Sequence, residues 1–157
     1  MKKFSVLLVA ILALMMLFVS CEHEPEKRAA TKEDGEIING LIMSAMGVAA
    51  SKDPVYKETV VRSSNEYEDT ITFKKAEYKE GDNVVAVLNG TMTMREDKKT
   101  STFSVDFGDG TKYKGVDHTL LANVVTNYGT DDIVSYEIML DGVILTDFDF
   151  DSLSSKH

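Results

Sequence analysis

The sequence predicts an α+β fold in which an N-terminal helix packs on a curved antiparallel meander of six to seven strands. The first observation behind this prediction is one long stretch, beyond residue 30, in which apolar residues recur at helical spacing. The second is the run of short segments after Pro54, where β-favouring residues alternate with polar residues between turn signals. One helix followed by a run of strands is typical of α+β domains.

The helix is expected over residues 31–51. Thr31 and Asp34 have the spacing of a capping box, and Pro54 ends the helix because proline disfavours helical backbone in the residue before it. Two apolar series run along it at helical spacing: Ile37, Leu41, Ala45 and Val48, and Ile38, Ile42, Met46 and Ala49. A third series consists of small residues that let the helix lie close to the sheet: Gly40, Ser44 and Gly47. We expect Ile42 and Met46 to be buried against the sheet.

Strands are expected where Thr, Val, Tyr and Phe alternate with polar residues. These segments are 55–63, 68–79, 84–95, 100–107, 111–116, 133–140 and 143–150. Residues 118–128 combine helical spacing with residues that favour strands, and a strand is the preferred interpretation. Asn89-Gly90 is either a tight hairpin turn or a bulge within one long strand. The short connections between segments indicate antiparallel neighbours.

Asp141-Gly142 predicts a two-residue hairpin turn with positive φ at both positions. The turn sets a register in which Phe148 and Phe150 face the core. The same register places three aspartates together on the opposite face: Asp147, Asp149 and Asp151. These aspartates form either a solvated face, which we favour, or a site for a cation or a basic partner.

The charge balance argues against two classes of partner. The chain has 17 Lys and Arg against 26 Asp and Glu, and removal of Lys2 and Lys3 with a signal peptide leaves 15 against 26, a net charge of −11. Nucleic-acid binding depends on neutralising phosphates with Lys and Arg, and adsorption to anionic lipid also needs basic segments. We therefore expect no nucleic-acid partner and interpret the charge as a source of solubility.

The N-terminus has the pattern of an export signal. Two lysines precede an apolar run at residues 4–19, and Ser20 and Cys21 follow it. The run is shorter than the roughly 20 apolar residues of a membrane span, and no block of Lys or Arg comes after it. The sequence thus predicts a signal peptide over 1–20, a lipidated N-terminus and flexible tether over 21–31, and a single globular domain over 32–157.

Phe18-Val19-Ser20-Cys21 resembles the lipobox of bacterial lipoproteins, with Phe18 in place of the usual leucine. The resemblance implies that a diacylglycerol is joined to the thiol of Cys21, that the chain is cut before this residue, and that the new amine is acylated, for example with palmitate. It also implies an extracytoplasmic protein anchored in a membrane by lipid, the outer membrane in a Gram-negative cell. Stable anchoring takes two or more acyl chains, which this modification supplies. Cys21 is the only cysteine, so the mature chain has no internal disulfide.

The sequence contains no motif of catalysis, cofactor binding or metal binding. His23 lies in the tether and His157 at the end of the chain, so His118 is the histidine available to a folded site, and we expect it at the surface. The serines lie outside any nucleophile-elbow pattern, and neither zinc spacing nor a phosphate-binding loop is present. We therefore predict a protein that is not an enzyme and has no cofactor.

The segment Asp106–Thr111, with the sequence DFGDGT, is the most specific string in the domain. It resembles a segment of PKD domains, which are immunoglobulin-like β-sandwich modules of surface proteins. The resemblance covers these six residues and implies a sandwich with an adhesive role. The alternative is a plain hairpin whose glycines supply positive φ, and we favour it.

The resulting hypothesis is a lipid-anchored protein of the cell envelope with a non-catalytic binding or structural role. One alternative is a carrier of an apolar ligand in a cavity between helix and sheet. The lining of that cavity would include adaptable methionine side chains: Met43, Met46, Met92, Met94 and Met139. A third hypothesis is a PKD-like adhesion module or an uncharacterised enzyme. A carrier should have a continuous apolar cavity, whereas an enzyme should have a cleft with converging polar groups.

Overall fold

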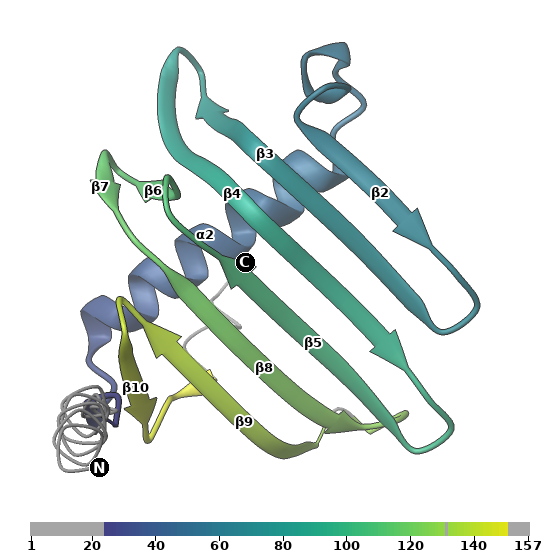
Figure 1. Ribbon diagram of the computed structural model, residues 1–157, viewed down its shortest axis with the longest axis vertical. Helices are drawn as coiled ribbons and strands as arrows, with labels where there is room; N and C mark the ends of the chain where they lie inside the picture. The colour runs from purple at the N-terminus through teal and green to yellow at the C-terminus, as the bar shows by residue number, and fades with distance from the viewer. Residues whose placement is uncertain (1–23, 131, 151–157) are drawn as a thin grey trace, which may run out of the picture.

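The computed structural model describes residues 24–130 and 132–150, and these residues form one ten-stranded sheet with a long helix on one face (Figure 1). The α+β class is confirmed, but the strand number is higher than the six or seven expected. Short strands account for the difference, because β1, β6 and β7 have only two or three residues each.

The elements follow one another as β1 (Lys27–Ala29), α2 (Lys32–Ala50), the 3-10 turn η1 (Pro54–Tyr56), β2 (Val60–Ser64), β3 (Glu68–Glu80), β4 (Asn83–Glu96), β5 (Thr100–Phe107), β6 (Lys112–Tyr113), β7 (Val116–Asp117), β8 (Leu120–Asn127), β9 (Ile133–Leu140) and β10 (Val143–Thr146). Residues 118–128 thus contain a strand, as preferred. The strand expected over 55–63 begins later, because η1 precedes it.

The sheet is a meander with two departures from the prediction. Its strand order is β1-β10-β9-β8-β5-β4-β3-β2, and the short pair β6 and β7 branches from β4. The first departure is β1, which pairs with β10 in parallel and lies inside the segment predicted as a tether. Since α2 then carries the chain across the sheet, β2 starts at the opposite edge (Figure 1). The second departure is that the strand expected over 111–116 is interrupted and forms β6 and β7.

Helix α2 is capped as the sequence predicts. The backbone N–H of Asp34 donates to Thr31 Oγ1 at 3.2 Å, and the backbone N–H of Thr31 donates to Asp34 Oδ2 at 2.7 Å. The expected buried face is only partly right: Ile42 is half-buried, and Met46 is 51% exposed. The prediction for Met46 is wrong because the face of α2 that is buried against the sheet lies between the two apolar series. This face takes apolar residues from both series: Ile38, Leu41, Ala45, Val48 and Ala49.

The small residues of α2 accommodate two tyrosine rings from the sheet. A Cβ atom at Gly40 would lie 2.2 Å from the ring of Tyr113 in β6, and one at Gly47 would lie 2.8 Å from the ring of Tyr78 in β3. The small residues of α2 therefore leave room for these rings and let the helix lie close to β3 and β6, as the sequence indicates.

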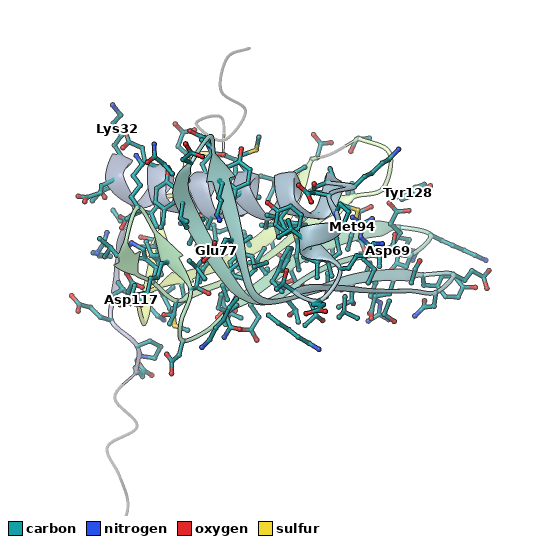
Figure 2. All side chains as sticks on the ribbon, turned by 90° about the horizontal axis from the view of Figure 1, so that it is seen from above. Lys32, Asp69, Glu77, Met94, Asp117 and Tyr128 are labelled. Carbon is teal, nitrogen blue, oxygen red and sulfur yellow. The ribbon has the colours of Figure 1, made fainter. Side chains whose placement is uncertain are left out.

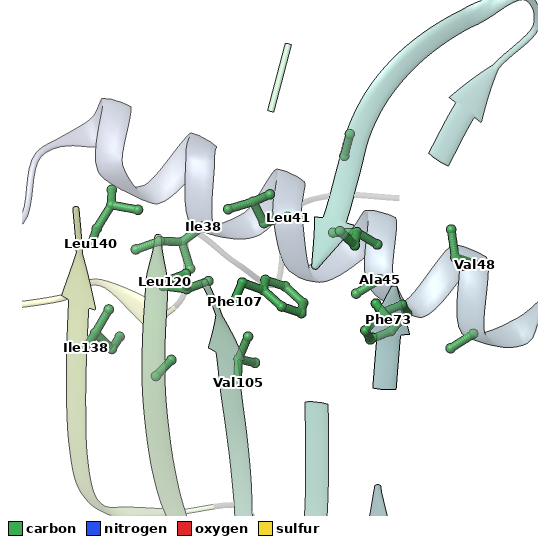
Figure 3. Close-up of a cluster of buried hydrophobic side chains, with 14 of the residues drawn as sticks. Ile38, Leu41, Ala45, Val48, Phe73, Val105, Phe107, Leu120, Ile138 and Leu140 are labelled. Carbon is green, nitrogen blue, oxygen red and sulfur yellow. The ribbon is translucent and has the colours of Figure 1, made fainter. Parts of the chain in front are cut away.

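The core lies between α2 and the sheet and is filled by side chains from six strands and the helix (Figure 3). Phe73 of β3 and Phe107 of β5 meet edge to face with ring centroids 5.8 Å apart, and each is 1% exposed. Leu120 and Leu140 continue the same row across β8 and β9. Burial of these apolar side chains is the main stabilising contribution to the fold.

Asn89-Gly90 lies inside the long strand β4, which settles the two alternatives in favour of a continuous strand. The extra residue of the bulge is on the partner strand, where the register shifts between Lys74 and Ala76 around Lys75. Lys75 has a φ of 52°, and Gly90 opposite this region has a φ of 146°. The bulge bends the β3–β4 pair toward α2, as bulges increase local twist (Figure 2).

The segment Asp106–Thr111 leaves β5 and closes onto β4 instead of forming a hairpin with β5. The backbone N–H of Gly108 donates to the Asn89 carbonyl at 3.0 Å. Thr111 is fully buried, and its hydroxyl accepts from the Asn89 N–H and donates to the Asn89 carbonyl, both at 3.1 Å. These bonds satisfy polar groups where β4 changes its partner from β5 to β6.

The Asp141-Gly142 turn has the expected geometry, with φ values of 52° and 80°. The first pairs, Val143 with Leu140 and Ile144 with Met139, also have the predicted register. The strand expected over 143–150 nevertheless ends at Thr146, because the next residue adopts a positive φ and the chain leaves the sheet.

Beyond this point the burial pattern is largely as predicted, although the geometry is not. Phe148 is buried, Phe150 is half-buried against the Tyr136 ring at 5.0 Å, and Asp147 and Asp149 are exposed. The predicted row of aspartates on a single strand face does not form over the described part, because the strand has ended. Its third member, Asp151, lies outside the described residues.

Candidate functional site

The N-terminal end of the domain is held by a buried carboxylate. Asp34 is 5% exposed and accepts two hydrogen bonds from Arg28 of β1, at 2.6 and 2.8 Å, and two from Thr31, both at 2.7 Å. The bidentate geometry with the guanidinium is the strong form of an ion pair. Asp34 thereby caps α2 and fastens β1 to it at the same time. We call the Arg28–Asp34 pair the N-terminal clasp.

Electrostatics favour the ionised clasp. The hydrogen bonds from Arg28 hold the pKa of Asp34 well below its ordinary value of 3.8; burial opposes this shift, and the Thr31 bonds add to it. In return, the hydrogen bond to Asp34 raises the pKa of Arg28. Both groups are therefore charged across the physiological pH range.

Asp34→Ala is expected to lower the free energy of unfolding by about 2 kcal/mol at pH 7, since a helix cap and charged hydrogen bonds are lost together. Because the pKa of Asp34 is lowered in the folded state, the parent should lose this stabilisation as the pH falls below about 4. Urea titrations from pH 7 to pH 2.5 measure both effects. Glu33→Ala, which removes an exposed acid from the same turn, is the control and should change little. Equal stability losses in the two variants would contradict a special role for Asp34.

His118 is the second candidate, and its side chain is only 9% exposed rather than at the surface as expected. Its Nδ1 lies 2.8 Å from Asp141 Oδ2, across the end of the sheet where Leu120 pairs with Leu140. The other oxygen of Asp141 accepts from the Thr119 N–H at 2.7 Å. Asp141 therefore links the β9–β10 turn to the start of β8.

The histidine borders an open hollow of about 520 Å³. Its lining contains no serine or cysteine among the described residues: Asp109, Gly110, Asp117, His118, Thr119 and Asp141. Asp117 is one of these lining residues, and its Oδ1 lies 3.5 Å from Lys112 Nζ. No group of three or more acidic, cysteine or histidine residues over 24–130 and 132–150 is arranged to hold a metal ion. The hollow therefore combines the His118 imidazole with carboxylates, and the nearest of these, Asp141, also orients the ring.

An apolar strip continues the core beyond the helix on the same sheet face. It crosses four neighbouring strands through register partners: Met94 of β4, Phe103 of β5, Val124 of β8 and Tyr136 of β9. Met94 is 50% exposed and Tyr136 is 37% exposed, whereas the two central members are half-buried. Figure 2 shows Met94 on the helix side of the sheet. Neighbouring exposed apolar side chains on a monomer are typical of interaction surfaces.

The methionines considered as a cavity lining do not converge. Met43, Met46 and Met94 are each about half exposed, whereas Met92 packs against the core and Met139 lies on the opposite sheet face beside Leu121. The space between α2 and the sheet is occupied by the buried side chains of Figure 3. The five side chains therefore belong to different surfaces.

The clasp was not expected, because Arg28 was assigned to a tether. A signal was nevertheless present: an arginine shortly before a capping aspartate is able to reach it once the chain turns at Thr31. The proximity of His118 to the Asp141 turn also had a signal, since the start of one antiparallel strand lies beside the end of the next. Cys21, His23 and His157 lie outside the described residues.

Comparisons with protein-family models, with curated proteins and with solved structures found no match to this chain. Over the described ranges, no helix combines the length and the apolar character required to cross a membrane.

Proposed function

We propose that this chain is a lipid-anchored extracytoplasmic protein of the cell envelope, with a domain that binds or supports a partner and does not catalyse a reaction. The observation that carries the anchoring is the Phe18–Cys21 tetrad at the end of the apolar run 4–19. The domain behind it begins within a few residues, at β1, which suits a protein held at a membrane by its N-terminus.

A binding role is supported by the apolar strip. Met94 and Tyr136 expose apolar surface in the same register row, and a domain that bound nothing would be more soluble with polar residues there. The His118–Asp141 pair has a sufficient structural explanation, because Asp141 also accepts the Thr119 N–H and closes the end of β8. The oriented histidine therefore requires no catalytic role.

The alternative is a carrier that encloses an apolar ligand. Such a carrier needs an apolar volume between α2 and the sheet, and this space is filled in the described structure by Leu41, Phe73, Phe107 and their neighbours. Contact through the apolar strip needs no such opening, so binding at the surface is the preferred form of the proposal.

Cys21→Ser is expected to abolish incorporation of radiolabelled palmitate and to move the protein from the membrane fraction to the soluble fraction or leave it unprocessed. The reason is that the thiol is the proposed site of the diacylglycerol. Phe18→Leu, which restores the usual lipobox residue, is the control and should be labelled at least as well as the parent. If the serine variant is still cut at the same bond and still sediments with membranes, the anchoring proposal is wrong.

A further inference from the structure

The folded domain begins close to Cys21. The first backbone hydrogen bond that joins the N-terminal segment to the sheet runs from the Ile144 N–H to the Glu26 carbonyl, at 2.7 Å. At the other end of β1, the Ala30 N–H donates to the Thr146 carbonyl at 2.8 Å. Together with the N-terminal clasp, these bonds hold residues 26–30 against β10 and α2.

Covalent geometry then limits how far the domain stands from an anchor at Cys21. The five residue steps from Cys21 to Glu26 span at most about 18 Å in any conformation. If β1 were released, ten steps would lead to the helix cap at Thr31, and the limit would be about 35 Å. A domain of this size has a radius of gyration of about 14 Å, so the shorter tether restricts rotation and the longer one does not.

Electrostatic attraction to lipid does not hold the N-terminal end of the domain at the membrane. The basic residues near the tether are outnumbered by acidic ones: Lys27, Arg28 and Lys32 against Glu24, Glu26, Glu33, Asp34 and Glu36. Arg28 is moreover paired with Asp34 within the domain. An anionic lipid surface would repel this end of the protein, so electrostatic adsorption cannot hold it there.

We infer that β1 and the N-terminal clasp act together as a device that shortens the tether and turns the β1 edge of the sheet toward the lipid surface. This inference rests on the proposed anchoring at Cys21. The opposite edge, formed by β2 and the hairpin that bears Tyr67, then faces away from the membrane. Figure 1 shows β10 and β2 on opposite sides of the sheet.

Energy transfer from a single tryptophan to dansyl-labelled lipid in phosphatidylcholine vesicles tests the orientation. The chain has no tryptophan, so each introduced one reports a single position. Met139→Trp lies two strands from β1, through Ile144, and Tyr67→Trp replaces a 60% exposed ring beside the far edge. Five strand spacings of about 4.8 Å separate β9 from β2, so transfer should be about twofold or more stronger from position 139.

We call the ratio of transfer from position 139 to transfer from position 67 the contrast, and two changes should reduce it. Arg28→Ala opens the clasp, and an insertion of six Gly-Ser residues between His23 and Glu24 lengthens the tether without touching the fold. Lys32→Ala is the matched control, since it removes an equal charge from a side chain that is 93% exposed, and it should leave the contrast unchanged. Equal transfer from both tryptophans in the parent, or a contrast that survives the insertion, would overturn the inference.

The test also separates this inference from the anchoring proposal. All described elements of the fold lie within 24–150, so the chain starting at Cys21 can be produced without lipid and coupled through its only cysteine to a maleimide lipid in the same vesicles. A contrast in the coupled protein supports the tether device even if cells fail to label Cys21 with palmitate. If the parent protein carries palmitate but shows equal transfer from the two positions, the tether device is refuted and the anchoring proposal stands.

Discussion

Gly90→Ala is expected to destabilise the domain by about 4 kcal/mol, because steric overlap and backbone strain act together. A Cβ atom at this position would lie 2.0 Å from the carbonyl oxygen of Asp106 on the neighbouring strand. The φ of Gly90 is 146°, a conformation that residues with a side chain rarely adopt. Relief of the overlap requires β4 and β5 to separate where Gly90 pairs with Phe107, in the centre of the core. Urea denaturation followed by far-UV circular dichroism measures the loss.

Gly108→Ala is the matched control for this substitution. A Cβ atom at Gly108 would have no neighbour within 4 Å, and this glycine is not among those with positive φ. We expect the Gly108 variant to be as stable as the parent or slightly more stable, since alanine reduces the entropy of the unfolded chain. Similar stability of the two alanine variants would show that β4 and β5 do not approach closely at Gly90.

Phe107→Ala is expected to cost about 3–5 kcal/mol, the range for truncation of a buried aromatic side chain. Its ring is 1% exposed, contacts Phe73 edge to face and lies under Leu41 and Ala45 of α2 (Figure 3). Truncation leaves a cavity at the point where the helix meets the centre of the sheet. The same denaturation experiment reports the change in the free energy of unfolding.

Two further variants test whether the loss in Phe107→Ala comes from the cavity in the core. Phe107→Leu refills part of the cavity and should recover at least half of the loss, whereas Tyr67→Ala, at a position that is 60% exposed, should cost little. A loss below about 1 kcal/mol for Phe107→Ala would contradict its place in the core and the packing of α2 over β5.

Features that depend on short stretches of chain were predictable. The Thr31–Asp34 box marks the start of α2, and Pro54 follows its end. The Asp141-Gly142 turn follows from turn chemistry. Phe148 is buried for a different reason, because the chain leaves the sheet at Asp147 and this ring then joins the core cluster. The two alternatives at Asn89-Gly90 remained open because a glycine inside a β pattern is compatible with both.

The candidate site was less predictable. The assignment of Arg28 to a tether concealed β1 and the clasp, since three exposed residues carry no periodic signal of their own. His118 was expected at the surface because its contact, Asp141, lies 23 residues away in the chain. Neither contact has a signature within a window of adjacent residues.

The sequence by itself determined the α+β class, the extent of the helix and most of the strands, because periodicity, capping and turn preferences act between near neighbours. Tertiary structure alone decided that Leu41 and not Met46 faces the sheet, because two apolar series were available and the core has room for one contact line. It also decided that β1 joins β10 in parallel, since α2 and all the other strands separate these two strands along the chain and no local pattern links them. Asp34 becomes buried and strongly acidic at the same point, because its partner Arg28 is brought to it by that pairing.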